Sequence, residues 1–477
     1  MTDLETTGFW TTLFVVSDWA IRLVMLPIVP TRRSPEAAKG WLLFIFFLPW
    51  LGLALYLLIG RPRVPRWRTE RFRQFMHAIE PVREKMRALP LLAAPAVTPQ
   101  YEPSVLLATD LGMLPNFGGN AVELLTDYEA TVERIARDID GAQSTAHLCF
   151  YIFASDARTA VVIEALGRAV QRGVQCRVLV DAFGSRPRIP KLVPQLRALG
   201  VATHIALPVR VGRKAARFDL RNHRKLVVID GRVGYTGSQN MVAADFKPGL
   251  TYSELMVRIE GPSALQLQAV FAADWFVETA EYVGDACFPA PVAAGDVPAQ
   301  MLPNGPSSST LPAQRMAVNL IHSATRRVVV TTPYFIPSQP FHNALETAVL
   351  RGADVHLIVD DHIDQFLVGN AQRSYYEELL VAGVQIHAYK EAFLHTKSVS
   401  VDGQVAWIGT CNMDMRSFEL NEELVALFFD RRIAGQLAAI EDAYMRGSDR
   451  ITLDEWRRRP FAQELVQNLS RLVSPLL

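Results

Sequence analysis

Cysteine is scarce in this chain and forms no recognisable motif. The four cysteines among the 477 residues, Cys149, Cys176, Cys287 and Cys411, show neither the C-x2-C spacing of a zinc site nor the regular spacing of a disulfide framework. The ten histidines likewise contain no H-x3-H or H-E-x-x-H cluster. We therefore expect reduced thiols, no protein-bound metal and no cofactor.

The chain also lacks an excess of charge of either sign. Its 49 lysines and arginines nearly balance 48 aspartates and glutamates, which gives a net charge of +1. Proteins that bind nucleic acid usually carry a broad basic surface. We therefore expect no nucleic-acid partner. The length favours two or three domains, each able to bury a core.

Long apolar runs are confined to the N-terminus, although hydrophobic residues make up 50% of the whole chain. Residues 41–60 carry no charge and are long enough to cross a hydrocarbon layer of about 30 Å, and Pro49 could kink this helix without excluding it. An earlier segment, about 9–30, contains Asp18 and Arg22, which are four residues apart and can pair on one helix face. We predict a transmembrane hairpin, with an interfacial helix as the alternative for the first segment.

Basic residues follow the second apolar segment more densely than they fill the loop before it. The loop has Arg32, Arg33 and Lys39, whereas the later segment has Arg61, Arg63, Arg66, Arg68, Arg71 and Arg73. Because basic residues favour the cytoplasmic side of a membrane, we predict a multi-pass membrane protein with its large C-terminal part in the cytoplasm. The same arginines can hold anionic lipid headgroups.

The remainder of the chain repeats one order of elements. In each half we expect a buried strand, then an amphipathic helix that ends near a Gly, and then a second buried strand that ends in Asp. These elements are 147–153, 158–172 and 175–180 in the first half, and 327–332, 341–351 and 354–359 in the second. Strands that alternate with helices indicate βαβ units. We therefore predict two pseudo-symmetric α/β/α domains with largely parallel central sheets.

Stretches rich in Pro, Gly, Ala and Ser suggest where these domains end. The expected division is a membrane anchor at 1–73, a linker at 74–120, a first domain at 121–284, a second linker at 285–310 and a second domain at 311–477. The last segment, 453–477, is amphipathic and rich in Arg, and could lie on a membrane or pack on the second domain.

A short pattern, H-x-K-x4-D, occurs once in each half. The first copy is His223, Lys225 and Asp230, and the second is His395, Lys397 and Asp402. Each copy runs into a Gly and is followed by a small polar stretch that ends in Asn, as Gly237-Ser238-Gln239-Asn240 and Gly409-Thr410-Cys411-Asn412. The same number of residues separates the two histidines as separates the two asparagines, which indicates a duplication.

The residue types in this pattern suit phosphoryl transfer. His and Lys alternate along a strand and so share one face, whereas the Asp has the opposite parity and lies in an Asp-Gly turn. We therefore expect His and Lys at the reaction and Asp230 and Asp402 in a structural role. One neutral imidazole can attack phosphorus while a second, protonated, one supplies a proton to the leaving alkoxide. Two lysines stabilise the developing negative charge.

Nearby polar residues are candidates for supporting roles. Amide donors can come from Asn240 and Asn412, and hydroxyls from Ser238 and Thr410. A carboxylate behind each imidazole would fix its tautomer, and Glu254 and Glu423 are placed to do so, although an ordinary surface carboxylate is an equal alternative. A basic run just before the first motif could clamp a headgroup or form a solvated loop; it comprises Arg210, Arg213, Lys214, Arg217 and Arg221.

Taken together, these motifs resemble the duplicated HKD signatures of the phospholipase D superfamily, and most closely those of bacterial cardiolipin synthases. The phrases that carry the resemblance are Asp219-Leu220-Arg221-Asn222-His223-Arg224-Lys225, Tyr235-Thr236-Gly237-Ser238 and Gly409-Thr410-Cys411-Asn412-Met413-Asp414-Met415-Arg416-Ser417-Phe418. The N-terminal hairpin and the terminal Ser474-Pro475-Leu476-Leu477 also resemble that family.

The resemblance implies a protein of the bacterial inner membrane and a membrane-bound transfer in which two phosphatidylglycerols give cardiolipin and glycerol, with no metal. By the same analogy His223 would be the nucleophile and His395 the acid and base, although the sequence leaves the exchanged assignment open. A phospholipase D that transfers to water is the nearest alternative, and a non-catalytic membrane scaffold is a more distant one. The sequence does not predict an oligomeric state.

Overall fold

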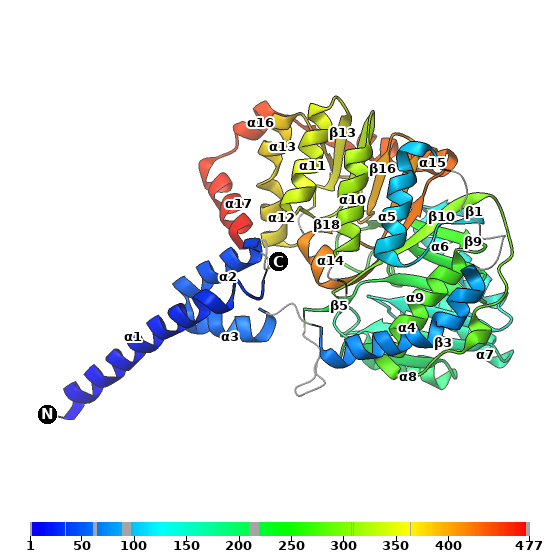
Figure 1. Cartoon of the computed structure of the whole chain (residues 1–477), viewed down its shortest axis with the longest axis horizontal. Helices are drawn as coiled ribbons and strands as arrows, with labels where there is room; N and C mark the ends of the chain where they lie inside the picture. The colour runs from blue at the N-terminus through cyan, green and yellow to red at the C-terminus, as the bar shows by residue number, and fades with distance from the viewer. Residues whose placement is uncertain are drawn as a thin grey trace.

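The structure is a computed structural model that describes residues 2–33, 35–60, 64–87, 97–208, 219–306, 308, 310–362 and 364–473. A helical arm at the N-terminus projects from a larger body in which a sheet is covered by helices (Figure 1). The α/β class and the N-terminal apolar helix that the sequence predicts are confirmed.

The arm consists of α1 (Thr2–Ile28), α2 (Pro35–Phe47) and α3 (Pro49–Ile59). Within the described residues, one helix, over Gly8–Ile28, is long and apolar enough to cross a membrane. Asp18 and Arg22 pair on this helix at 3.5 Å, as the sequence predicts, and the Arg22 Nε also donates to the Phe46 carbonyl in α2.

The segment predicted as one helix over 41–60 is divided in the structure. Leu48 has a non-helical backbone, with φ of −130° and ψ of 70°, and Pro49 starts a new helix, so α3 folds back along α2. The rings of Trp41 and Tyr56 meet edge to face with centroids 5.3 Å apart, and Gly52 lies against Ile45, where even a Cβ would come within 2.8 Å of the Ile45 backbone. Proline at the first turn of a helix is favourable, which explains the break.

The body is built on a single mixed sheet of 16 strands rather than on two separate ones. The strand order is β20-β14-β13-β11-β16-β17-β19-β10-β1-β9-β7-β6-β2-β3-β4, and β5 pairs with β19. Among the described residues, parallel pairing is limited to the βαβ units, β2-β3-β4 and β11-β13-β14, and to short bridges, whereas the central pairs are antiparallel. The prediction of largely parallel sheets therefore holds only for the outer part of each half.

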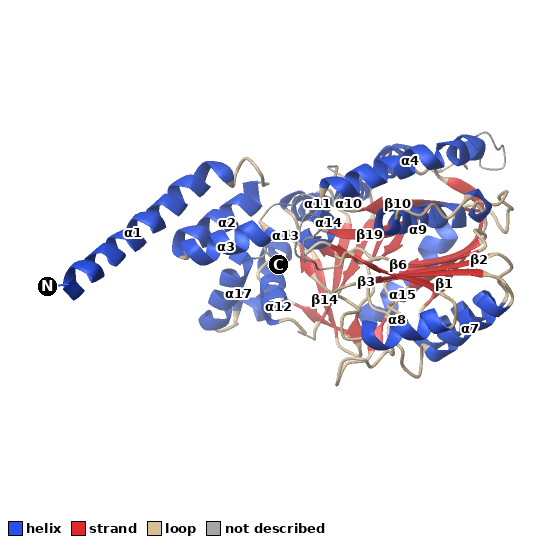
Figure 2. Cartoon of the chain, turned by 90° about the horizontal axis from the view of Figure 1, so that it is seen from below, coloured by secondary structure: helices blue, strands red, loops and turns tan. Residues whose placement is uncertain are grey.

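The first half contains the elements that the sequence predicts, with small shifts at their ends. Its strands are β1 (Phe117–Leu125), β2 (Thr145–Phe150), β3 (Gln175–Asp181), β4 (Ala202–Ala206), β5 (Arg221–Asn222), β6 (Lys225–Ile229), β7 (Val233–Gly237), β8 (Tyr252–Ser253) and β9 (Met256–Glu260). Its helices are α6 (Tyr128–Asp140), α7 (Ala160–Gln171), α8 (Ile189–Ala198) and α9 (Ala264–Thr279). Figure 2 shows α9 on one face of these strands and α7 and α8 on the other.

The second half repeats this plan. Its strands are β11 (Arg327–Thr332), β12 (Phe335–Ile336), β13 (Asp354–Asp360), β14 (Gln385–Tyr389), β15 (Phe393–Leu394), β16 (Ser398–Val401), β17 (Val405–Gly409), β18 (Met413–Asp414), β19 (Asn421–Phe428) and β20 (Ser448–Ile451). Its helices are α10 (Pro312–Ser323), α11 (Gln339–Leu350), α12 (Phe366–Arg373), α13 (Tyr376–Ala382), α14 (Met415–Glu419), α15 (Arg431–Arg446), α16 (Leu453–Arg457) and α17 (Phe461–Val473).

Both segments predicted as linkers contain regular structure. Segment 74–120 includes most of α4 (Arg66–Arg87), the short η2 (Pro99–Tyr101), α5 (Glu102–Gly112) and the start of β1, while residues 88–96 lie outside the described part. Segment 285–310 includes η3 (Asp285–Cys287) and β10 (Val297–Asn304), which joins the two halves of the sheet. Pro99 and Pro103 lie in the first turns of helices, and Pro298 and Pro303 lie in a strand whose other amides keep the ladder. Pro81 lies inside α4.

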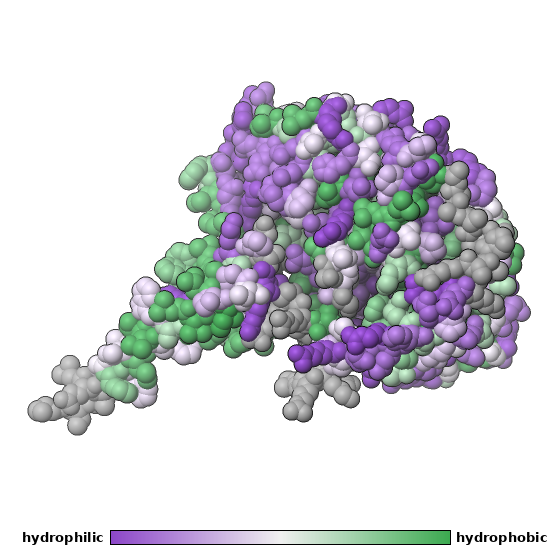
Figure 3. Space-filling model, in the orientation of Figure 1, coloured by the Kyte–Doolittle hydropathy of each residue, from purple (hydrophilic) through white to green (hydrophobic). Residues whose placement is uncertain are grey.

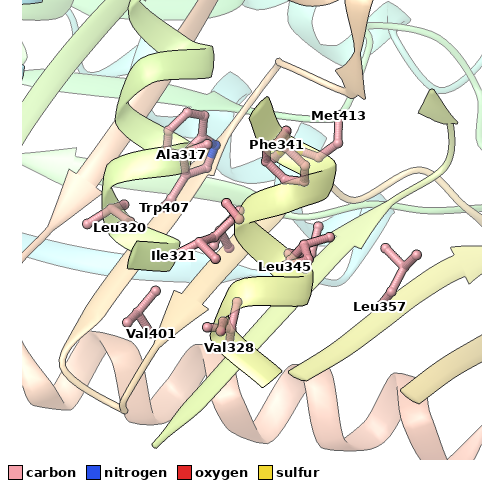
Figure 4. Close-up of a cluster of buried hydrophobic side chains, with 14 of the residues drawn as sticks. Ala317, Leu320, Ile321, Val328, Phe341, Leu345, Leu357, Val401, Trp407 and Met413 are labelled. Atoms are coloured by element: carbon pink, nitrogen blue, oxygen red, sulfur yellow. The ribbon is translucent and has the colours of Figure 1, made fainter. Parts of the chain in front are cut away.

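Apolar cores hold the helices on the sheet, and one of these cores contains residues of both halves. In the second half, side chains of α10 and α11 interlock with those of β11, β13 and β17, among them Leu320, Phe341, Val328, Leu357 and Trp407 (Figure 4). Each of these side chains is fully buried. Burial on this scale makes the sheet a rigid support for the loops at its edge.

Candidate active site

The two H-x-K motifs lie side by side where the halves meet. Each motif is hydrogen-bonded to the other half of the chain: the His223 amide donates to the Glu422 carbonyl, and the His395 amide donates to the Ser253 carbonyl, both at 2.9 Å. The short strands β5 and β15, just before the histidines, pair in parallel with β19 and β8, respectively. The halves thus assemble one shared site.

A cavity of about 530 Å³ opens over this junction. His223 and His395 both line it, together with Asn240 and Asn412. The two histidines are only 9% and 7% exposed, so their rings meet the cavity at one edge. This volume lies within the range of a small-molecule site.

Each histidine is held by a glutamate from the opposite half. His223 Nδ1 lies 2.9 and 3.0 Å from the two carboxylate oxygens of Glu423, and His395 Nδ1 lies 2.8 and 2.9 Å from those of Glu254. Both glutamates are buried. The carboxylates therefore lie behind the rings as the sequence suggests. That each glutamate contacts the histidine of the other half is a finding of the structure.

The carboxylates select one tautomer at each ring. An Nδ1–H that donates to Glu leaves Nε2, at the opposite edge of the ring, as the atom available to the cavity. Burial lowers the pKa of both His223 and His395 to about 4, with the neighbouring lysines adding to this effect. Burial raises the pKa of the glutamates, but their histidine and lysine neighbours lower it more, so the net shift is downward. Near neutral pH both imidazoles are therefore neutral and both carboxylates are ionised.

The lysines of the motifs are buried next to the backbone of the histidines. Lys225 and Lys397 are fully buried, and each Nζ donates to the carbonyl of the histidine in its own motif, at 2.7 Å for Lys225. Burial lowers the pKa of Lys225 to about 8 and that of Lys397 to about 7, while Glu254 and Glu423 raise both. An anion entering the cavity would favour their charged forms.

The aspartates of the motifs point away from the cavity, in the place that strand parity predicts. Asp230 and Asp402 occupy turns with φ of +53° and +54°. The Asp230 carboxylate accepts from the amides of residues 143–145, and the Asp402 carboxylate from those of residues 325–327. Each carboxylate thereby fixes the hairpin that carries the Lys to the strand beside it.

The polar residues after the motifs divide into two groups. Asn240 and Asn412 line the cavity, and the buried Oδ1 of Asn412 has no hydrogen-bond partner in the described protein. Ser238 and Thr410 lie deeper: Thr410 donates to Glu423 at 2.5 Å, and Ser238 helps to lower the pKa of Glu254. The hydroxyls thus support the carboxylates instead of facing the cavity.

Two further aspartates position the histidine segments. At the ends of β3 and β13, Asp181 accepts from the Asn222 amide at 3.0 Å and Asp360 accepts from the Leu394 amide at 2.7 Å. These amides belong to the residues immediately before the histidines. The sequence places both aspartates at strand ends, but its spacing gives no sign of this contact.

Aromatic and cationic side chains complete the cavity. Tyr151 and Tyr252 meet the rings of His223 and His395 edge to face, with centroids 4.9 and 5.4 Å apart. Three cationic residues also line the wall: Arg221, Lys247 and Arg416. Lys247 joins the halves through Asp364 at 2.6 Å. Arg416 lies in the conspicuous stretch after Asn412, so the sequence could have suggested its place in the cavity wall.

Of the basic run before the first motif, Arg221 is described and the other four members lie outside the described residues. Arg221 pairs with Asp181 at 3.6 Å and is only 2% exposed, so it forms part of the cavity wall. Within the described residues no group of three or more His, Cys, Asp or Glu side chains is arranged to hold a metal ion.

Comparison with known families matches more than half of the chain. The family described as "Cardiolipin synthase, PLD-like domain" matches residues 135–275 and 317–443, and "Phospholipase_D-nuclease N-terminal" matches residues 19–61. The first two matched ranges each contain one H-x-K motif and the glutamate that serves the other.

Full-length relatives are found among curated bacterial proteins. Cardiolipin synthase A of Proteus mirabilis is 35% identical over 492 aligned positions, covering 100% of both chains, and that of Pectobacterium carotovorum is 34% identical, covering 98% of both. Among solved structures, the phosphatidylserine synthase of Haemophilus influenzae superposes with a TM-score of 0.59 at 14% identity, over 79% of this chain and 100% of that one. This last likeness concerns the fold.

Proposed function

The chain belongs to the cardiolipin synthase family of phospholipase D-like enzymes, and from this membership we propose that it makes cardiolipin and glycerol from two molecules of phosphatidylglycerol through a phosphohistidine. The observation that carries the proposal is the pair of imidazoles on one cavity, each oriented by a buried carboxylate. A nucleophile and a proton donor on opposite sides of one phosphorus are what a two-step displacement needs.

In the first step, Nε2 of His223 attacks the phosphorus of the first phosphatidylglycerol. The bond from phosphorus to the headgroup oxygen breaks, and protonated His395 supplies a proton to that oxygen, so glycerol leaves. A phosphatidyl group remains bound to His223. Lys225 and Lys397 offset the charge that develops on the phosphoryl oxygens, and Asn240 and Asn412 supply amide groups at the cavity wall.

In the second step, His395, now neutral, accepts the proton of a headgroup hydroxyl on a second phosphatidylglycerol. That oxygen attacks phosphorus, the phosphorus–nitrogen bond breaks, and cardiolipin forms. His395 ends the cycle protonated, as it began. Water in place of the second lipid would give phosphatidic acid instead.

The protonated form of His395 depends on the substrate. Burial in the protein lowers the pKa of both histidines to about 4. A phosphodiester anion between the rings adds a negative charge next to each imidazole and so raises its pKa. We therefore propose that the catalytic proton is taken up as the first lipid binds.

A direct test uses purified, detergent-solubilised protein with phosphatidylglycerol alone and EDTA. We expect cardiolipin and free glycerol in equal amounts. Phosphatidic acid without cardiolipin would instead identify a hydrolase. Absence of any turnover would contradict phosphatidylglycerol as the donor and favour another lipid or a non-catalytic role.

The orientation in the membrane forms part of the same proposal: the catalytic halves face the cytoplasm of a multi-pass protein. The basic residues Arg66, Arg68, Arg71 and Arg73, at the start of α4, support it. A reporter fused after Leu477 should be active in the cytoplasm, and activity only outside would overturn the assignment. If the chain crosses the membrane twice, a reporter placed before Met1 should also lie in the cytoplasm. A reporter before Met1 that is active only outside the cytoplasm would mean that the α2–α3 hairpin turns back within the bilayer.

A further inference from the structure

The C-terminal helix α17 has its faces reversed relative to a helix of a soluble protein. Its buried residues are polar, namely Gln467 at 0% exposure and Ser470 at 4%. Its apolar residues point outward, between 38% and 76% exposed: Phe461, Leu465, Val466, Leu469 and Leu472. A helix on the surface of a soluble protein normally turns its apolar side to the core.

Contacts on the polar side hold α17 in this orientation. Arg471 pairs with Glu378 of α13 at 2.6 and 3.1 Å, and its guanidinium lies 4.2 Å from the centroid of the Tyr375 ring. Because these contacts fix the polar face inward, the apolar face is presented outward by the fold itself. An exposed, contiguous apolar face of this kind marks an interaction surface.

The same surface continues to the mouth of the active-site cavity. Helix α12 lies against α17 and contributes Gln365, its N-cap, and Val368 to the cavity wall. Between them in sequence, Phe366 and Leu367 are 66% and 46% exposed. From the other half, Phe183 lines the cavity and is 48% exposed. Apolar side chains therefore flank the opening from both halves.

The surface also lies next to the membrane arm. Both views of the chain place α17 at the end of the body from which the arm projects (Figures 1 and 2), and the space-filling view shows apolar residues on the arm and on α17 (Figure 3). We propose that the exposed faces of α12 and α17, the docking face, rest on the lipid bilayer and hold the cavity mouth against it.

This proposal rests on the proposed function and adds a route for the substrate. A phosphatidylglycerol whose chains stay in the bilayer can place its phosphate at the histidines only if the mouth meets the lipid surface. The docking face provides that contact without carrying acyl chains through water. The bilayer is favoured over a second copy of the chain because the face lies at the same end of the body as the apolar arm.

The test uses the full chain in nanodiscs containing phosphatidylglycerol, with one fluorophore on an introduced cysteine. The native cysteines are all buried, which favours selective labelling. Leu469→Cys reports on the docking face. Val161→Cys, 38% exposed on α7 at the far end of the body from the arm, is the matched control. Doxyl-labelled lipids should quench the fluorophore at position 469 several-fold more than the one at position 161.

Equal, weak quenching at both positions would overturn the proposal. So would disulfide-linked dimers of Leu469→Cys without quenching, which would assign the face to a second copy. Cardiolipin is measured in the same nanodiscs. Cardiolipin without quenching refutes the docking face and leaves the proposed function intact, whereas quenching without cardiolipin supports the docking face and counts against the function.

Discussion

Replacing either His223 or His395 by Ala is expected to lower cardiolipin formation by about 10⁶-fold, the scale on which a serine protease loses activity when its nucleophile or its proton carrier is removed. Neither variant leaves an imidazole to replace the missing one, since the remaining histidine is fixed on its own carboxylate. The measurement is the initial rate with phosphatidylglycerol. His322→Ala, an exposed histidine on α10, should retain full activity.

A donor whose leaving group needs no proton separates the two histidines. With a phosphatidyl ester of p-nitrophenol, His395→Ala should still release a burst of nitrophenolate, because attack by His223 needs no acid there. His223→Ala should release none. The reverse pattern would exchange the two roles, and a burst from both variants would contradict a covalent histidine intermediate.

The second large effect is expected at the glutamates. Glu423→Gln and Glu254→Gln keep the size of the side chain but remove the charge and allow the amide to select the wrong tautomer of the imidazole. A comparable neutral substitution behind a catalytic histidine costs about 10⁴-fold in kcat in serine proteases, and we expect a loss of about 10²- to 10⁴-fold here. The loss should fall on kcat with KM nearly unchanged, because neither carboxylate lines the cavity.

Which glutamate serves which histidine is tested by double-mutant cycles on the unfolding free energy. Strong coupling is expected for His223 with Glu423 and for His395 with Glu254, the pairs in contact. The same-half combinations, His223 with Glu254 and His395 with Glu423, serve as controls and should couple more weakly. If the same-half pairs coupled more strongly, the exchange between halves would be refuted.

Sequence patterns predicted the local elements well, because these depend on nearby residues. The strand at 327–332 is reproduced without a shift, and the strand at 354–359 gains only Asp360. Parity also placed Asp230 in a turn, away from its histidine. In each case the governing physics, alternation along a strand or the conformation of an Asp-Gly turn, acts over a few residues.

What the sequence did not predict depends on contacts between distant segments. The residues around Glu254 do not tell which of the two histidines, His223 or His395, this glutamate contacts. The strand β10 contains Pro298 and Pro303 and lies in a segment whose composition suggested a linker. Its pairing with β1 and β19 overrides that local signal. The separation of α2 from α3 follows Pro49, whose effect in a long apolar run depends on packing.

The exchange of glutamates also constrains how such a chain could have arisen. If the halves descend from one duplicated unit, that unit carried a histidine and a glutamate that could not reach each other within one copy. An ancestor of half the length would then have worked only as a pair of identical subunits about a two-fold axis, each completing the other's imidazole. Gene fusion would have made that partnership permanent and allowed the two histidines to take different roles, as the proposed mechanism requires.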